Sequence, residues 1–354
     1  MSNKIYFTPG PAQLFYTIQD HIKSAIFHDI GSISHRSAEF TKVVKETQEN
    51  LKVLLELPDG YDVFFINSAN EAWDRIIQNL VISQSHHFVN GAFSEKFYDF
   101  SKIQGMTSSK TESSKGNTFS NFEVPETAEL IGITKNETSV GYSFTEKEIE
   151  TLRLSNPHKL IALDVVSATP SVPVNFSNID TAYFSVQKCF GMPPGLGVWI
   201  ANEQCQDKAK QKAKNSTIGS YRSLANLKKF GAKNQTPETP NTIYIYLLGK
   251  IVKDMLDVGI KKLRNDTTYK AVILNQMVKD HPDLSHFVDS EVHRSKTTIV
   301  AKSVKANDII EKIAKKGLIL GNGYGEFKDD HVRIANFPTH SKESVEMLCD
   351  LLMK

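Results

Sequence analysis

Two residues with complementary chemistry follow two apolar runs in the middle of the chain. The run Leu160–Leu163 stops at Asp164, and the run Thr181–Val186 stops at Gln187 and Lys188. Short apolar runs of this kind are typical of buried strands, whose carboxyl ends form ligand sites at the edge of an α/β sheet. A lysine and a carboxylate at one edge suit pyridoxal 5′-phosphate. The lysine binds this cofactor covalently, and the carboxylate keeps its ring nitrogen protonated.

The same two residues also have structural interpretations. An aspartate at a strand end is often a helix cap, and a lysine in a loop is usually solvated. The neighbouring segments are therefore needed to distinguish a cofactor site from purely structural roles of Asp164 and Lys188.

The composition excludes several classes of protein. With 354 residues the chain exceeds the size of one core, so two lobes are expected. Its 40% hydrophobic and 23% charged residues are typical of a soluble globular protein, and the net charge of +2 argues against nucleic acid as a partner. The lysine-rich run Asp207–Lys214 is interpreted as a solvated helix face.

No apolar run is long enough to span a membrane, and the first residues contain no export signal. The three cysteines (Cys189, Cys205 and Cys349) have no metal-binding spacing, so no metal site is predicted. A reduced, cytoplasmic compartment is expected.

Strands and helices alternate over the first two thirds of the chain, which is the rhythm of a mostly parallel sheet. Strands are predicted at 62–66, 87–89, 130–133, 160–163 and 181–186. Helices are predicted at about 40–55, at 69–81 and from Gly91 to about Ile103. The polar segment Thr107–Ser120 is expected to be a surface loop.

The pattern changes after a long apolar helix that begins near Ile243. One strand (297–300), a helix (307–316) stopped by Gly317, a strand (332–335) and a final helix predict a smaller α+β domain. The predicted division is a large domain of residues 16–245 and a small domain of residues 1–15 and 246–354.

Five further segments resemble the phosphoserine aminotransferases, which are class V, fold-type I enzymes dependent on pyridoxal phosphate. The likeness extends over nearly the whole chain and rests on the Asp164–Lys188 unit together with these segments: FTPGPA (7–12), SHRSAEF (34–40), GAFSEKF (91–97), NET (136–138) and TPNTIYIY (239–246). It implies a mostly parallel central sheet flanked by helices, with a smaller α+β C-terminal domain. The implied activity is transamination in serine biosynthesis, between O-phospho-L-serine and 3-phosphohydroxypyruvate, with 2-oxoglutarate and L-glutamate as the second pair.

The cofactor phosphate has a predicted site where the strand ending near Asn67 meets a helix. The backbone N–H groups of Ser68, Ala69 and Asn70 are free to bind an anion at this helix N-terminus, and the side chain of Gln187 adds a donor. The segment is also a normal helix cap.

The resemblance assigns further cofactor contacts. Phe93 takes the position of the aromatic ring that stacks on the cofactor, Thr138 that of a hydroxyl bound to its phenolic oxygen, and Ser167 supports the region of Asp164. Thr239 would reach the cofactor phosphate of the other subunit in a homodimer with shared active sites. The preceding residue is Glu238, which must turn away from that phosphate, be protonated or pair with a cation.

Substrate recognition is implied for three basic residues. Arg333 matches the arginine that holds the α-carboxylate of the amino acid, and its other interpretation is a surface arginine on a strand. His35 and Arg36 match a pair that holds the distal phosphate or carboxylate from the other subunit. A second such pair is absent from the loop Gly321–Asp330, where Lys328 substitutes in part.

Two alternative functions remain open. Another class V aminotransferase, for alanine and glyoxylate or for an acidic amino acid, would keep the chemistry and change the substrate. A non-catalytic protein that binds pyridoxal phosphate would keep the pocket without the reaction. Within the first alternative, the cationic pair His35 and Arg36 opposes a small apolar substrate such as alanine. The second alternative is opposed by the presence of Asp164, Lys188 and Arg333 together.

Overall fold

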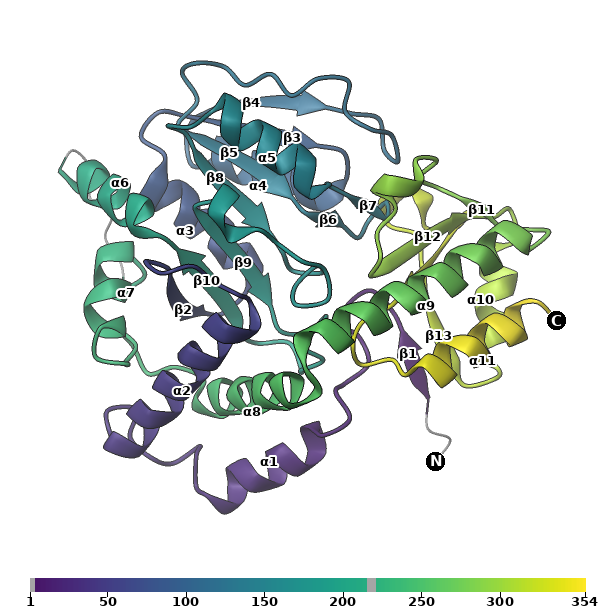
Figure 1. Ribbon diagram of the computed structural model, residues 1–354, viewed down its shortest axis with the longest axis horizontal. Helices are drawn as coiled ribbons and strands as arrows, with labels where there is room; N and C mark the ends of the chain where they lie inside the picture. The colour runs from purple at the N-terminus through teal and green to yellow at the C-terminus, as the bar shows by residue number, and fades with distance from the viewer. Residues whose placement is uncertain (1–3, 215–220) are drawn as a thin grey trace.

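A computed structural model describes residues 4–214 and 221–354, which form two large sheets with helices around them. Figure 1 shows the larger sheet in the purple-to-green part of the chain and the smaller sheet beside the yellow C-terminal helices. This arrangement confirms the predicted α/β class with a smaller α+β part.

The larger sheet has seven strands in the order β2-β10-β9-β8-β5-β3-β4. Strand β10 pairs antiparallel with β2 and β9, whereas all the pairs from β9 to β4 are parallel. The carboxyl ends of β2, β9, β8 and β5 therefore meet at one edge. In sheet order the strands are β2 (Asp62–Ile66), β10 (Gly197–Ala201), β9 (Thr181–Ser185), β8 (Leu160–Asp164), β5 (Leu130–Thr134), β3 (Gln84–Val89) and β4 (Thr107–Glu112).

Helices bury both faces of this sheet, because neighbouring strand residues point to opposite faces. In β5, for example, Leu130 packs into one hydrophobic cluster and Ile131 into the other. The cluster with Leu130 includes α3 (Ala69–Leu80), α4 (Ala92–Ile103), α6 (Glu203–Ala213) and α7 (Leu224–Gly231). The cluster with Ile131 includes α1 (Ile18–Phe27), α2 (Ala38–Leu54), α5 (Glu146–Ser155) and α8 (Thr242–Val258).

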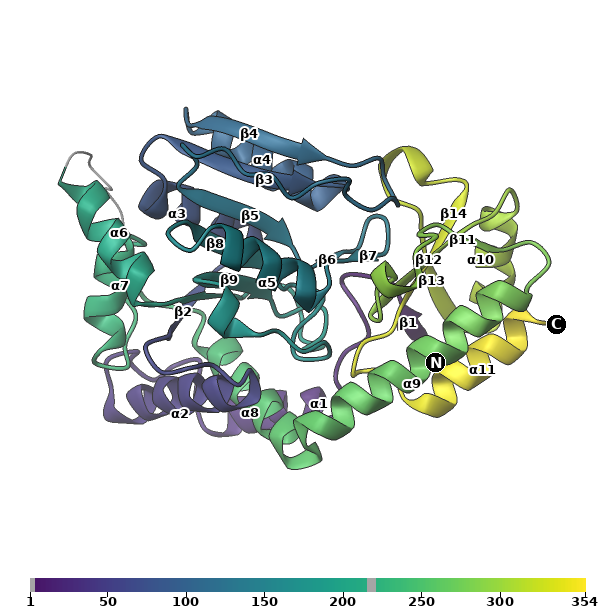
Figure 2. The ribbon, with the colours of Figure 1, turned by 45° about the horizontal axis from the view of Figure 1, so that its top comes forward.

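The smaller sheet has five strands in the order β1-β13-β14-β12-β11, and it joins the two ends of the chain because β1 pairs with β13. Figure 2 shows α9 (Ile260–Asp280) running from the end of α8 to this sheet, where α11 (Lys342–Leu352) lies beside it. The strands of this sheet are β1 (Ile5–Phe7), β11 (Ser285–His286), β12 (Thr298–Lys302), β13 (Leu318–Asn322) and β14 (His331–Ala335), and α10 (Ala306–Ala314) connects β12 to β13. A separate two-stranded ribbon consists of β6 (Asn136–Glu137) and β7 (Tyr142–Ser143). Three short 3₁₀ turns lie at Phe176–Asn178, Glu291–His293 and Gly325–Phe327.

Two expectations were wrong in detail. The segment Thr107–Ser120 is not entirely a loop, because its first half is β4, an edge strand whose residues are all partly or fully exposed. The lysines of Asp207–Lys214 do not all lie on a solvated face. Lys212 is buried and donates to the carbonyl of Ile77, and Lys208 pairs with Glu129. The domain boundaries at 15/16 and 245/246 stay predictions, and residues 1–3 lie outside the described part.

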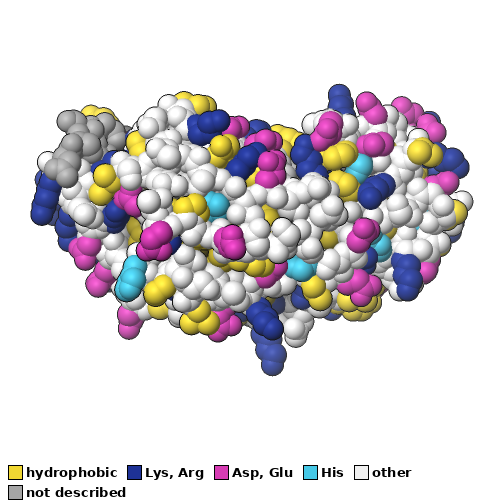
Figure 3. Space-filling model, turned by 90° about the horizontal axis from the view of Figure 1, so that it is seen from above, with side chains coloured by type: hydrophobic (Ala, Val, Ile, Leu, Met, Phe, Trp, Pro, Cys, Tyr) yellow, Lys and Arg dark blue, Asp and Glu magenta, His cyan; other side chains and the backbone are white. Residues whose placement is uncertain are grey.

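The surface agrees with the small net charge. Acidic and basic side chains are interspersed over the face shown in Figure 3. Among the described residues, no helix is long and apolar enough to cross a membrane, and no cluster of histidine, cysteine and carboxylate side chains is arranged to hold a metal ion.

Candidate active site

A cavity at the carboxyl edge of the larger sheet gathers most of the predicted site residues. It contains about 430 Å³ of space free of protein atoms, part of which is open to solvent. Of the residues selected from the sequence, Ala69, Asn70, Phe93, Thr138, Asp164, Ser167, Gln187 and Lys188 line it. The sequence analysis did not identify Trp73, Thr134, Asn136, Val166 and Ser185, which complete the wall.

The amine of Lys188 lies in the middle of this group. Its Nζ donates a hydrogen bond of 3.2 Å to the hydroxyl of Thr138 and lies 5.3 Å from the centre of the Phe93 ring. Burial lowers the pKa of Lys188 to about 8, although nearby Asp164 acts in the opposite direction. A larger fraction of this amine is therefore neutral at pH 7 to 8 than in an ordinary lysine, and a neutral amine is the nucleophilic form.

Asp164 ends β8 and is held by a buried polar chain. Its Oδ1 accepts the N–H of Val166 at 2.9 Å, and its carboxylate also accepts the hydroxyl of Tyr183. The Tyr183 oxygen in turn accepts the indole N–H of Trp73 at 2.6 Å. Burial raises the pKa of Asp164 to about 7. A cationic ring nitrogen beside this carboxylate would favour its ionised form.

The N-terminus of α3 forms another wall of the cavity. Ser68 caps the helix, since its hydroxyl accepts the N–H of Glu71. The N–H of Ala69 is not free, because it donates to the hydroxyl of Ser185 at 2.7 Å. The amides of Ser68 and Asn70, the other two predicted donors, have no hydrogen-bond partner among the described residues, as is usual at a helix N-terminus.

Close packing shapes this end of the cavity. A Cβ atom on Gly197 would lie 2.7 Å from the carbonyl carbon of Ser68, so only glycine allows β10 to approach the turn. Gln187 also lines the cavity, and its buried Oε1 has no hydrogen-bond partner among the described residues. A buried amide without a partner in a cavity wall indicates that a ligand completes its bonding.

The segment 136–138 connects several parts of the site. Asn136 donates to the hydroxyls of Ser167 and Thr297 at 2.7 and 3.0 Å. Glu137 is fully buried and accepts the backbone N–H groups of Phe93 and Ser94, at the start of α4. The resemblance assigned a role only to Thr138 in this segment, whereas the structure shows that its neighbours fix the surrounding walls.

Arg333 extends from β14 of the smaller sheet toward the cavity. Its Nε donates to the carbonyl of Asn322 at 2.6 Å, and its Nη1 donates to the carbonyl of Thr138 at 3.3 Å. Tyr324 lies beside it, with its ring 5.4 Å from the guanidinium carbon and 5.3 Å from the Phe93 ring. Lys96 donates to the Tyr324 hydroxyl at 2.9 Å. The sequence analysis identified neither Tyr324 nor Lys96.

Five predicted residues are not among those that line this cavity: Ser68 and Arg333, described above, and the group of Thr239, His35 and Arg36. Thr239 is exposed, and its hydroxyl lies 3.4 Å from Nδ1 of His35. Arg36 donates to the side chain of Gln235 and to the carbonyls of Thr236 and Pro237. The resemblance placed all three in the site of a second subunit, and within one chain they lie together around the segment 235–239.

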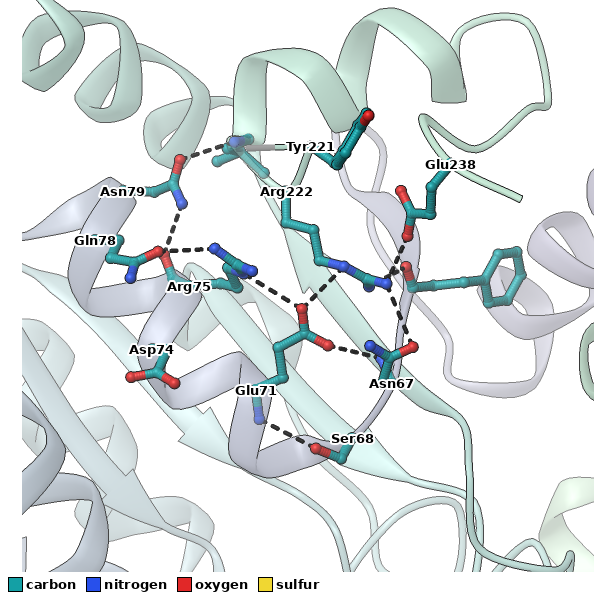
Figure 4. Close-up of polar contacts among 12 residues, drawn as sticks. Asn67, Ser68, Glu71, Asp74, Arg75, Gln78, Asn79, Tyr221, Arg222 and Glu238 are labelled. Atoms are coloured by element: carbon teal, nitrogen blue, oxygen red, sulfur yellow. Dashed lines mark hydrogen bonds and ion pairs between the residues drawn. The ribbon is translucent and has the colours of Figure 1, made fainter. Parts of the chain in front are cut away.

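Glu238, the residue that departed from the family pattern, has a cationic partner. Its Oε1 lies 2.5 Å from Nη2 of Arg222. Of the three outcomes considered for this carboxylate, the structure shows the ion pair (Figure 4).

The residues present fit pyridoxal 5′-phosphate. The cavity offers an amine with a lowered pKa, a buried carboxylate, an aromatic ring, a hydroxyl next to the amine and amide donors at a helix N-terminus. Each of these groups matches one functional group of that cofactor.

Comparison with known proteins gives a consistent result. The family model for class-V aminotransferases matches residues 6–325. A solved phosphoserine aminotransferase from Cytophaga hutchinsonii is 44% identical, covers 99% of both chains and superposes with a TM-score of 0.97. A phosphoserine aminotransferase from Rhodococcus opacus is 26% identical over 89% of this chain and 85% of its own length. An alanine–glyoxylate aminotransferase from Nostoc shares the fold at 18% identity, with a TM-score of 0.84, covering 100% of this chain and 95% of its own.

Proposed function

The chain belongs to the class-V aminotransferase family and is a pyridoxal-phosphate-dependent enzyme, and from this premise we propose that its amino donor is O-phospho-L-serine. The products would be 3-phosphohydroxypyruvate and L-glutamate, with 2-oxoglutarate as acceptor, in serine biosynthesis. The supporting observation is the 44% identity, over 99% of both chains, to the phosphoserine aminotransferase of Cytophaga hutchinsonii.

Lys188 is proposed as the catalytic base and acid. When bound, the cofactor supplies an aldehyde that carries the amino group and a ring that accepts the electrons released at the α-carbon. The amine of Lys188 would hold the cofactor covalently between turnovers. As a neutral amine it would take the proton from the α-carbon of the substrate, and as the resulting ammonium group it would give that proton to the carbon of the cofactor that carries the amino group. Its lowered pKa of about 8 suits both roles near neutral pH.

Three neighbours would orient the reacting groups. Asp164 would bind the ring nitrogen and keep it protonated, with Tyr183 and Val166 fixing the carboxylate by hydrogen bonds. Phe93 would hold the ring plane, and Thr138 would donate to the phenolic oxygen. Ser167 supports this wall through its hydrogen bond with Asn136.

The phosphate would bind at the N-terminus of α3. Amide groups of Ser68 and Asn70 supply donors there, and Gln187 contributes its side chain. The Ala69 amide orients the hydroxyl of Ser185 instead of meeting the phosphate directly.

Arg333 would hold the α-carboxylate of the amino acid, since a guanidinium can form a bidentate, charge-assisted pair with it. Burial lowers the pKa of Arg333, although arginine stays charged at neutral pH.

We further propose a homodimer, in which Thr239, His35 and Arg36 of one subunit bind the phosphate groups in the active site of the other subunit. The proposal includes a cytoplasmic location and the division into domains of residues 16–245 and of residues 1–15 with 246–354.

The test is the absorbance spectrum of the cofactor-loaded protein during separate additions of L-glutamate, O-phospho-L-serine and L-alanine. We expect glutamate and phosphoserine to convert the visible band to the pyridoxamine form, with alanine leaving it unchanged. Both expected substrates carry a distal anionic group, which alanine lacks.

Other responses would change the assignment. A band that responds only to alanine would retain the enzyme class and contradict the proposed substrate. A band that responds to glutamate alone would indicate an aminotransferase for acidic amino acids. A band that no amino acid changes would favour a binding protein that does not catalyse the reaction.

A further inference from the structure

A buried arginine joins two carboxylates beside the N-terminus of α3. Arg222 precedes α7, and its side chain is 10% exposed. Its Nε lies 2.9 Å from Oε1 of Glu71, and its Nη2 lies 2.5 Å from Oε1 of Glu238. Figure 4 shows the guanidinium group between these two carboxylates.

The same guanidinium group also contacts the turn that leads into α3. Nη2 donates to the side-chain oxygen of Asn67 at 3.3 Å, and Nη1 donates to the carbonyl of Phe65 at 3.3 Å. Glu71 in turn accepts the backbone N–H of Asn67 at 2.9 Å. Arg222 is therefore connected to both sides of Ser68, the cap of the helix whose first residues, Ala69 and Asn70, line the cofactor cavity.

The charges in this cluster matter for an anion site. Glu71 lies in the first turn of α3, where the helix dipole favours negative charge, so its carboxylate competes with a bound phosphate for the same field. Glu238 adds a second negative charge at the neighbouring segment. Arg222 pairs with both carboxylates, and Arg75 also contacts Glu71 at 3.3 Å. These four side chains together are neutral.

We propose that Arg222 is a positioning residue for the cofactor phosphate. It directs the carboxylates of Glu71 and Glu238 away from the amide donors of α3, and it cancels their charge. Its bonds to Asn67 and Phe65 fix the turn that presents those donors. Through Glu238 it also fixes the segment that contains Thr239.

The test compares two probes that differ only in the phosphate group. The affinity of the cofactor-free protein for pyridoxal 5′-phosphate and for pyridoxal is measured by absorbance titration. For Arg222→Met we expect the Kd of pyridoxal phosphate to rise at least about tenfold and the Kd of pyridoxal to change less than about twofold. An equal rise in the Kd of both probes would overturn the proposal, because it indicates a general loss of structure. No change in either Kd would also overturn it, because Arg222 would then have no role at the phosphate site.

Two further variants examine the charge itself. Adding Glu238→Gln to Arg222→Met removes one unpaired carboxylate, so at least about a threefold recovery of pyridoxal phosphate binding is expected. Glu238→Gln alone leaves the charge of Arg222 less compensated and should lower the Kd of pyridoxal phosphate about twofold, with pyridoxal unchanged. This single variant decides the question even if Arg222→Met does not fold, since an unchanged Kd would contradict the proposal.

Arg264→Met is the matched control. Arg264 is also largely buried, at 18% exposure, and pairs with Glu56 at 2.6 Å, but it does not line the cavity. Its loss should leave both affinities unchanged. The readout is cofactor binding, so it does not depend on which amino acid is the substrate, and failure of the phosphoserine proposal would not affect it.

Discussion

The carboxylate of Glu137 accepts the backbone N–H of Phe93 at 3.0 Å, which ties the aromatic wall of the cavity to the loop that carries Thr138. The same carboxylate accepts the N–H of Ser94 at 2.9 Å and the hydroxyl of Ser139 at 2.6 Å. Gly91 makes this approach possible, because a Cβ atom there would lie 2.4 Å from Cγ of Glu137. A buried acid with this many donors fixes the start of α4.

Replacing Glu137 with glutamine should destabilise the protein by about 1–3 kcal/mol, since the buried donors lose a charged acceptor. Urea unfolding measures this change. Glu95→Gln, in the first turn of the same helix, is the control and should change stability by less than about 0.5 kcal/mol. Equal effects of the two substitutions would show that the network around Glu137 contributes nothing specific.

Lys188→Ala should abolish turnover and the visible band of the covalently held cofactor. General acid–base catalysis contributes about 10²–10⁴-fold, and the covalent attachment is lost in addition. Steady-state assays and the absorbance spectrum measure the two effects, and circular dichroism checks the fold. Retention of activity in this variant would contradict the proposed mechanism.

Cofactor capture by the cofactor-free protein should depend on pH through Lys188. Because burial lowers the pKa of this amine to about 8, its neutral fraction is one half near pH 8 and levels off above about pH 9. An ordinary lysine with a pKa of 10.5 would continue to gain neutral amine above pH 9. Stopped-flow mixing with pyridoxal phosphate from pH 6 to 10 measures the profile, with N-acetyl-lysine as the reference amine. A profile identical to the reference would show that burial does not tune Lys188.

Arg333→Lys should raise the KM for the amino acid by about 10-fold or more with a smaller effect on kcat. Hydrogen bonds to charged groups contribute about 1.5–3 kcal/mol, and lysine cannot form the bidentate pair. Kinetics with glutamate give the two constants, and the Kd of pyridoxal phosphate should stay unchanged. A fall in kcat at constant KM would argue against a role in binding the carboxylate.

Acid should destabilise the fold through buried histidines. Burial lowers the pKa of His87 to about 3, below the ordinary value of 6.5, so its contribution is complete above pH 6.5 and is lost as pH falls toward 3. At pH 5 the unfolded chain carries nearly one proton here that the folded chain does not. His87→Gln should therefore reduce the loss of unfolding free energy between pH 7 and 5 by about 2 kcal/mol.

Urea unfolding at the two pH values measures this difference. The exposed His158 is the control, because His158→Gln should leave the pH dependence unchanged. The same pH dependence in wild type and His87→Gln would rule out His87 as the source.

The parts of the fold with strong periodicity could be predicted from the sequence. The strand that ends at Asp164 and the helices over 38–54 and 92–103 follow from buried runs and helical spacing. Strand β4 was not predicted because it lies at the edge of the sheet and buries no residue fully. Its sequence therefore lacks the apolar residues by which strands are recognised. Strand β13 was missed because its short run follows directly on a helix stop at Gly317.

The candidate site was predictable where a residue type itself carries chemistry. Lys188, Asp164 and Thr138 are examples, and they line one cavity. Residues whose role depends on where the fold places them could not be selected from the sequence. Tyr183 faces Asp164 only because β8 and β9 pair in that register. Ser185 meets the Ala69 amide only because their strand and helix end at the same edge.

The ion pair between Arg222 and Glu238 has an evolutionary consequence. A glutamate that arises at position 238 without an arginine at position 222 would leave an uncompensated carboxylate near the α3 turn, whereas the arginine alone is tolerated beside Glu71. The arginine is therefore expected to have been acquired first. Among related chains a glutamate at position 238 should therefore occur only together with a cation at position 222, whereas a cation at 222 can persist beside an uncharged residue at 238 because it still pairs with Glu71.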